Sequence, residues 1–146
     1  MRLYNIMKAK KGLSSNDLFE CLFKINSKTI NLLDLSTVSH DTRMIWSSGK
    51  PYKDSQSINA DFSDCIEVEE KSVYICTQNI FAACFDGLKN YLGVYDKNSD
   101  SLIKGQCDLY NSFEIPLDTK YIRICTFDRN GLSIPFDEKA AFYKSK

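Results

Sequence analysis

The sequence predicts an all-β domain, a jelly-roll β-sandwich, with a short helical extension at its N-terminus. From about residue 28 onward, short runs rich in β-branched and aromatic residues alternate with clusters of turn-forming residues, which is typical of all-β domains. No helical segments separate these runs, which argues against a parallel α/β sheet. The chain has 146 residues, 43% of them hydrophobic, so it is long and apolar enough for one domain with its own core.

The first 30 residues are expected to hold a short helix. In "SSNDLFECLFKIN", Ser14 and Asp17 have the spacing of residues that cap a helix start. Four apolar side chains then recur on one helical face: Leu18, Phe19, Leu22 and Phe23. Because so short a helix is marginal without a packing partner, this face either packs on its own domain or docks onto another subunit. The predicted organisation is therefore an attachment segment, residues 1–30, and a β-sandwich, residues 31–146.

The first clear strands are expected between residues 65 and 87. "CIEVEE" and "SVYICT" are strand-length runs with a Glu-Glu-Lys turn between them. Alternation in the second run puts Val73 and Ile75 on one face and Tyr74 and Cys76 on the other. The run "NIFAACFDG" follows and ends on the turn signal Asp86-Gly87.

The later strands come in two pairs. "NYLGVYDKNSDSLIKG" predicts strand, turn and strand, with Asp, Asn and Ser supplying the turn. "SFEIPLDTKYIRICTF" predicts two closing strands joined by a short turn, with Pro116 at the end of the first, where a missing amide does least harm. In the second strand, Ile122 and Ile124 are expected to face the core. The opposite face would take Tyr121, Arg123 and Cys125. The tail "IPFDEKAAFYKSK" has no assigned form.

Charge and hydropathy argue against several classes of partner. Lys plus Arg and Asp plus Glu number 19 each, and this balance argues against a nucleic-acid-binding protein and against attraction to an anionic membrane. No apolar run reaches the ~18 residues needed to span a bilayer, and the N-terminus lacks the signal-peptide pattern. We therefore expect synthesis in a cytoplasm and no membrane insertion. A net charge near zero favours self-association, so a homo-oligomer is expected.

The sequence offers no recognisable set of catalytic or metal-binding residues. His40 is the only histidine, and the adjacent Asp41 cannot orient its ring because neighbouring side chains diverge. An exposed loop histidine is therefore predicted, and no enzyme activity. "DKNSDS" partly resembles a calcium loop but lacks the sixth-position glycine, so a polar hairpin turn is predicted instead. We expect no metal and no cofactor.

The six cysteines are expected to be reduced and mostly buried. They are Cys21, Cys65, Cys76, Cys84, Cys107 and Cys125. The even number is compatible with disulfides, but a cytoplasm keeps thiols reduced. No pair has the CxxC spacing of a zinc knuckle. Most are therefore interpreted as small buried hydrophobic residues.

The aromatic residues are the only residues in this sequence that suggest a ligand-binding function. Tyrosine and tryptophan combine an apolar face with a polar tip, which suits the C–H surfaces and hydroxyls of sugars. Most of the aromatic residues are expected to pack in the core or at the edges of a sandwich, without a binding role. Trp46 and Tyr52 are the candidate glycan contacts, because the segment "WSSGKPYKDS" that contains them is predicted to be a loop.

The order of these segments resembles a module common in tail, baseplate and fibre proteins of bacteriophages. The matching positions are Asn31-Leu32-Leu33-Asp34, Gly49, Ile66 with Val68, Tyr95-Asp96 with Asn98, and Pro116 with Thr119 and Tyr121 to Ile124. They span roughly residues 30 to 128. The resemblance implies a jelly-roll (galactose-binding-like) sandwich similar to carbohydrate-binding domains, without catalysis and without defined binding residues.

Two functions follow as expectations. The first is a bacteriophage virion structural protein, in the tail, baseplate or head fibres, that contacts other virion proteins and displays the sandwich for attachment to a host. The alternative is a lectin-like module that binds a host cell-surface polysaccharide without a virion role. In the first case Leu18, Phe19, Leu22 and Phe23 are the candidate residues for docking to the particle, and the protein is located in the virion.

Overall fold

The structure, a computed structural model, describes residues 30–145. All of these residues except Ile30 belong to the second of two units into which the chain divides, Asn31–Lys146. The described strands are β1 (Arg43–Met44), β2 (Pro51–Tyr52), β3 (Ile66–Glu67), β4 (Val73–Phe85), β5 (Tyr91–Asp96), β6 (Ser101–Ile103), β7 (Tyr110–Glu114), β8 (Tyr121–Cys125) and β9 (Phe142–Lys144). Two 3-10 turns, η1 (Leu35–Thr37) and η2 (Ser55–Ser57), interrupt the loops. All strand pairs are antiparallel, and the prediction of an all-β domain is confirmed.

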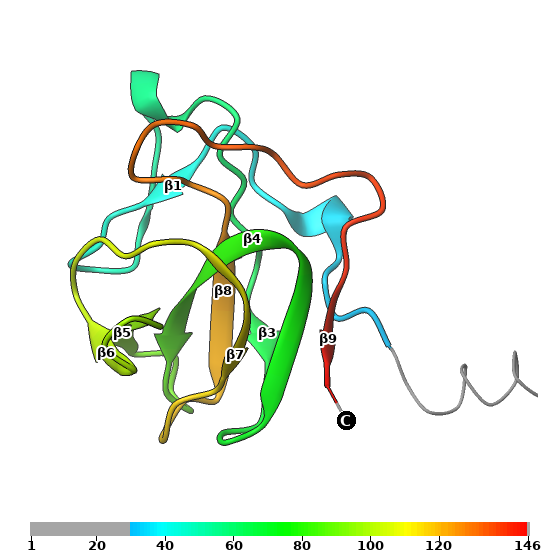
Figure 1. Ribbon diagram of the computed structural model, residues 1–146. Helices are drawn as coiled ribbons and strands as arrows, with labels where there is room; N and C mark the ends of the chain where they lie inside the picture. Colours follow the sequence, from blue (N-terminus) through cyan, green and yellow to red (C-terminus); the bar gives the residue numbers. More distant parts are fainter. Residues whose placement is uncertain (1–29, 146) are drawn as a thin grey trace, which may run out of the picture. The chain divides into compact units, whose positions relative to one another are not determined.

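The organising element is β4, a 13-residue strand that takes part in two sheets. Its second half pairs with β5 and β8, and its first half pairs with β7 and β9. Figure 1 shows β4 arching between these two sets of partners. One sheet thus has the order β3-β8-β4-β5-β6, and β7 and β9 flank the other half of β4.

The bend in β4 corrects the expectation of two separate runs at 72–77 and 79–87. The runs are continuous, and the pairing register with β7 shifts between Ile75 and Ile80. Such irregularities bend a strand and increase its twist. The polar residues Thr77 to Asn79 lie at this point, so what the sequence marks as a break in the apolar pattern is a bend within one strand.

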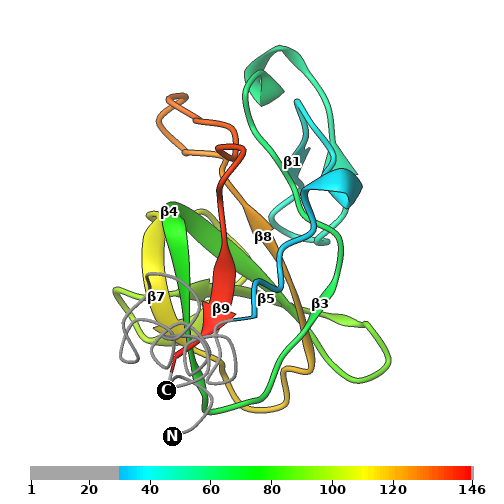
Figure 2. The same ribbon diagram turned by 90° about the vertical axis from the view of Figure 1, so that its right-hand side faces the viewer.

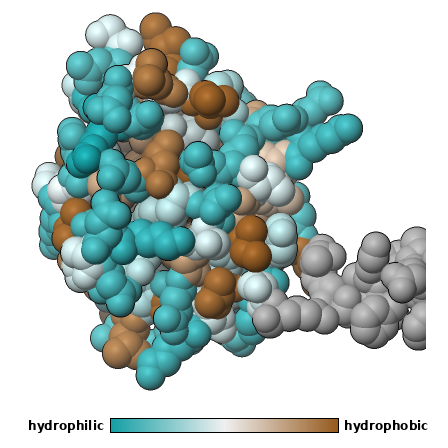
Figure 3. Space-filling model, in the orientation of Figure 1, coloured by the Kyte–Doolittle hydropathy of each residue, from teal (hydrophilic) through white to brown (hydrophobic). Residues whose placement is uncertain are grey.

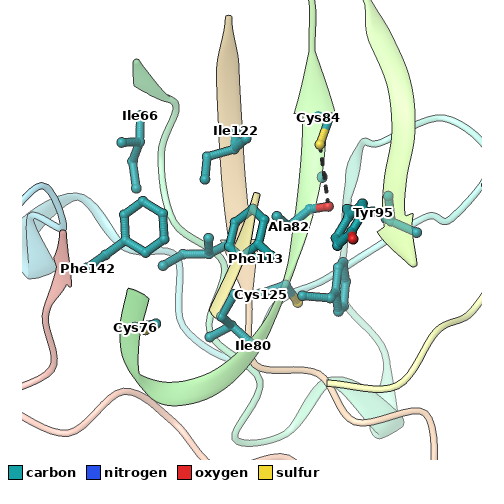
Figure 4. Close-up of a cluster of buried hydrophobic side chains, with 14 of the residues drawn as sticks. Ile66, Cys76, Ile80, Ala82, Cys84, Tyr95, Phe113, Ile122, Cys125 and Phe142 are labelled. Carbon is teal, nitrogen blue, oxygen red and sulfur yellow. Dashed lines mark hydrogen bonds between the residues drawn. The ribbon is translucent and has the colours of Figure 1, made fainter. Parts of the chain in front are cut away.

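The core lies between the two sheets and receives side chains from both. Figure 4 shows Phe113 and Phe142 from one sheet facing Ile66 and Ile122 from the other. Ile122 and Ile124 are fully buried, which confirms their predicted orientation. In β4, Tyr74 and Cys76 are buried and Val73 is exposed, which confirms that the two pairs lie on opposite faces, and the structure shows which face is inward.

Cys125 was expected on the face of β8 opposite Ile122 and Ile124, and on that face it is covered by other parts of the chain. Its side chain is fully buried, Phe62 bridges to it across the sheet edge, and its Sγ accepts from the Phe127 amide at 3.3 Å. Arg123 on the same face is half-buried and does have partners. Its guanidinium lies 4.0 Å from the centre of the Phe62 ring, and its Nε donates to the Ser63 carbonyl at 2.7 Å.

The two ends of the described chain lie together. The Asn31 side chain accepts from the Phe142 amide at 2.9 Å and donates to the Ala140 carbonyl at 3.3 Å. The Leu32 amide donates to the Phe142 carbonyl at 2.7 Å. The C-terminal segment, which had no assigned form, thus contains strand β9. On one side β9 pairs with β4, and on the other the first described residues run along β9 (Figure 2).

The predicted turns are also present. The segment after β5 forms a polar hairpin into β6, closed by a hydrogen bond from the Tyr95 hydroxyl to Asp100 at 2.6 Å. The turn after Pro116 links β7 to β8. These two strands do not pair with each other, because each pairs with a different half of β4.

Candidate functional site

The best candidate site in the described residues is an open groove of about 780 Å³ beside the bend of β4. Its walls come from the bend, from the start of β7 and from the β8–β9 loop, residues 126–141. In both ribbon views this loop lies above the bend (Figures 1 and 2). The lining residues are Thr77, Gln78, Asn79, Leu109, Asn111, Thr126, Asp128, Leu132, Ile134, Pro135, Phe136 and Asp137.

Gln78 holds the loop wall against β4. Its Nε2 donates to the Pro135 carbonyl at 3.1 Å, and its Oε1 accepts from the Asp137 amide at 2.5 Å. Both ends of one side-chain amide are thus bonded to backbone groups two residues apart in the loop. This arrangement fixes the segment without help from a ligand.

The buried carboxylate of Asp61 holds the same segment from the other side. The Phe136 amide donates to Asp61 Oδ2 at 2.8 Å, and the Asp61 backbone amide donates to the Thr126 hydroxyl at 2.8 Å. Only 2% of the Asp61 side chain is exposed. A buried carboxylate is costly unless it is paired and hydrogen-bonded, so these bonds are part of what keeps the loop in place.

The other oxygen of Asp61 contacts His40. His40 Nδ1 lies 2.8 Å from Asp61 Oδ1, and 69% of the histidine side chain is exposed. The prediction of an exposed loop histidine is therefore confirmed, but its carboxylate partner comes from 21 residues away and was missed. In the described residues no serine or cysteine side chain is hydrogen-bonded to His40, so this pair does not extend to a nucleophile.

The groove offers unused polar groups beside an apolar shelf. The side chains of Asn79 and Asn111 are exposed and make no hydrogen bond within the part of the chain that the structure describes. Leu132 and Ile134, which are 72% and 69% exposed, form the shelf. On the face shown in Figure 3, hydrophobic residues lie in separate groups among hydrophilic ones. The groove therefore combines hydrogen-bonding groups with apolar contact area, the usual composition of a small-ligand site.

The two aromatic residues singled out from the sequence lie outside this groove. Trp46 follows β1 and is half-buried, with its ring stacked on Phe81 at 4.6 Å between centres. Its indole nitrogen is buried without a partner in the described residues. Tyr52, in β2, is 40% exposed and carries the Arg43 guanidinium 4.8 Å from its ring centre. The structure thus places one ring face of Trp46 in core contacts and leaves Tyr52 on the surface.

The cysteines of the described residues are free thiols, and the prediction that most are buried is confirmed. Cys76, Cys84, Cys107 and Cys125 are buried, and Cys65 is half-buried. Burial raises the pKa of the Cys84 and Cys125 thiols from 9.0 to about 12, so these groups stay protonated and unreactive. Within residues 30–145 no three His, Cys, Asp or Glu side chains gather as a metal site would require.

The predicted docking residues Leu18, Phe19, Leu22 and Phe23, and also Cys21, lie outside the described residues. The groove residues themselves were not identified from the sequence. One signal pointed to them: "TQN" at 77–79 interrupts an otherwise apolar run. The contribution of the β8–β9 loop carries no such signal, because it depends on how a distant segment packs.

Comparison with known proteins gives no relative for this chain: no family model, curated protein or solved structure matches it. In residues 30–145 no helix has the length and hydropathy needed to cross a membrane.

Proposed function

We propose that this protein is a non-catalytic, glycan-binding structural component of a bacteriophage virion, in the tail, baseplate or head fibres. In this proposal the sandwich is a jelly roll, the groove beside the β4 bend takes a host-surface saccharide, and residues 1–30 attach the domain to other virion proteins. The observation that carries the binding role is the groove itself, with the exposed amide side chains of Asn79 and Asn111 next to an apolar shelf. The virion role rests on the resemblance of the segment order over residues 30–128.

The chemistry of the groove suits a saccharide. Sugar hydroxyls both donate and accept hydrogen bonds, and amide side chains such as Asn79 and Asn111 do the same. The C–H faces of a sugar ring pack on apolar surface, which Leu132 and Ile134 supply. The loop wall is already fixed by Gln78 and Asp61, and a preorganised site loses less entropy on binding.

A glycan array tests the binding role. We expect the wild-type protein to be retained by at least one surface oligosaccharide and the double variant Asn79→Ala/Asn111→Ala to lose that retention at least tenfold. Both side chains are exposed and unbonded in the described residues, so the variant should fold normally. Tyr52→Ala is the matched surface control, and its retention should be unchanged if the groove is the site. Absence of retention by any glycan would overturn the binding role.

The Trp46→Ala variant tests whether Trp46 contacts the glycan or only packs in the core. Because the Trp46 ring stacks on Phe81, its removal disturbs the packing, and weaker retention would identify a contact only if the melting temperature were unchanged. Selective loss of retention by Trp46→Ala or Tyr52→Ala, with the groove variant unaffected, would move the site to the β1–β2 hairpin.

The virion role has its own test. Deletion of residues 1–26 should abolish incorporation into phage particles and leave a soluble β-domain. Normal incorporation of the shortened protein would contradict the attachment role of Leu18, Phe19, Leu22 and Phe23. A lectin-like module without a virion role remains the alternative, and it would bind glycan but never co-purify with particles. Hydrolysis assays on acyl and glycosyl model substrates should show no turnover in either case.

A further inference from the structure

The side chains that line the groove carry charge of one sign only. Asp128 and Asp137 are the charged residues among the described residues that line it, and no lysine, arginine or histidine does so. Each carboxylate accepts one bond from a backbone amide in its own turn, from Asn130 at 2.9 Å and from Lys139 at 3.0 Å. The second oxygen of each has no hydrogen-bond partner in the part of the chain that the structure describes.

The two cationic side chains of the β8–β9 loop, Arg129 and Lys139, do not line the groove. Arg129 forms an ion pair with Asp108 at 2.8 Å and lines a separate pocket together with residues of the 55–59 segment. Lys139 is exposed and is not a lining residue. The two carboxylates are therefore not neutralised by a basic side chain within the groove.

An ionised carboxylate only accepts hydrogen bonds. A ligand that fills this groove must therefore offer donors to Asp128 and Asp137, and a sugar hydroxyl or ammonium group does so. A uronate carboxylate, a sulfate or a phosphate has no hydrogen to donate there and adds like-charge repulsion. Of the remaining free groups, the amides of Asn79 and Asn111 accept or donate equally well and do not offset this preference.

We propose that the groove selects uncharged or amino-bearing glycans and rejects acidic ones. This inference rests on the proposed glycan-binding function and adds the substrate class. The two groove carboxylates and an acidic ligand are in contact with solvent, and at that screening their repulsion should weaken binding of the acidic ligand by roughly tenfold or more. Because such repulsion is screened by salt, the discrimination should shrink at about 500 mM NaCl.

The experiment compares oligosaccharides of matched size on one array: chito-oligosaccharides, their deacetylated ammonium forms, neutral gluco- and galacto-oligosaccharides, and oligogalacturonates. The test variant is Asp128→Asn/Asp137→Asn, which keeps the amide-accepting oxygen of each turn and removes both charges. The control is Glu67→Gln/Glu114→Gln, which changes net charge equally at two exposed sites outside the groove.

The expected result is retention of neutral or ammonium glycans and at least tenfold weaker retention of oligogalacturonates. The Asp128→Asn/Asp137→Asn variant should narrow that gap at least fivefold, and the control should leave it unchanged. Retention of oligogalacturonates at the groove as strong as that of neutral glycans overturns the inference while the binding function stands. An equal effect of test and control variants also overturns it, because the selection would then come from net charge. Retention of no glycan overturns the binding function and this inference with it.

Discussion

Replacing Tyr110 by Phe tests the proposed reason for the stability of the bent strand. Tyr110, at the start of β7, is buried, and its hydroxyl bridges two other strands. The hydroxyl accepts from the Ala82 amide of β4 at 2.8 Å and donates to the Tyr95 carbonyl of β5 at 2.7 Å. Burial raises the pKa of Tyr110 well above its usual range, so the hydroxyl keeps its proton. It supplies partners to backbone groups next to the β4 bend.

The magnitude follows from what the substitution leaves unpaired. Ala82 is fully buried, so its amide would lose its hydrogen-bond partner without access to water. The Tyr95 carbonyl would keep a weak bond from the Cys107 thiol at 3.7 Å. One fully unsatisfied buried donor costs about 2 kcal/mol. For a domain of this size, that corresponds to a fall in melting temperature of roughly 8 °C.

The assay is urea unfolding followed by circular dichroism, together with a thermal scan. Tyr143→Phe is the matched control, because the Tyr143 side chain is half-buried and its hydroxyl makes no hydrogen bond within residues 30–145. We expect the control to change stability by less than about 0.5 kcal/mol, the usual range for substitutions away from such features. A Tyr110→Phe variant as stable as the control would refute the bridging role of the hydroxyl.

Three further predictions concern other parts of the domain. Gly93→Ala should destabilise the protein by at least about 2 kcal/mol in urea unfolding, because φ at this residue is +128° and a Cβ would lie 2.8 Å from a backbone oxygen of β6; unchanged stability would contradict this account. Gln78→Leu should speed hydrogen exchange at the Asp137 amide with little change in global stability. Unchanged exchange would contradict the role of Gln78 in holding the β8–β9 loop against β4. The pKa values of Cys84 and Cys125, raised from 9.0 to about 12 by burial, mean that the unfolded state loses these protons first as pH rises. The free energy of unfolding should therefore be unchanged below pH 9, and the two thiols together should lower it by roughly 4 kcal/mol by about pH 10.5. In the double variant Cys84→Ala/Cys125→Ala, the free energy of unfolding should fall less steeply over this pH range.

Most of the longer strands and their turns were predictable because their signals are local, whereas β1, β2 and β9 were not predicted. Alternation in "YIRIC" identified Ile122 and Ile124 as core residues, and the Asp86-Gly87 and "DKNSDS" turns lie where composition placed them. The exposed position of His40 was also predictable. The continuity of β4 was not, because the polar residues at 77–79 look the same in a turn as at a bend. Only the shifted register with β7 distinguishes the two.

The candidate site was almost entirely hidden from the sequence. Asp61 contacts His40 from 21 positions away and the Phe136 amide from 75 positions away. Gln78 reaches Pro135 across 57 positions. Local pattern gives no information on which distant backbone groups will meet a given side chain, since that depends on how the loops pack over the sheets.

The sequence by itself determined that this chain forms a β-domain, that Ile122 and Ile124 face its core and where several of its turns lie, because period-two alternation and turn propensities act over a few residues. Only the tertiary structure decided that β4 serves two sheets and that its bend lies under the β8–β9 loop. It also brought Asn79, Asn111, Asp128 and Asp137 to one groove. The physical reason is that a binding groove forms from contacts between segments far apart in the chain, whose meeting is set by packing of the whole core.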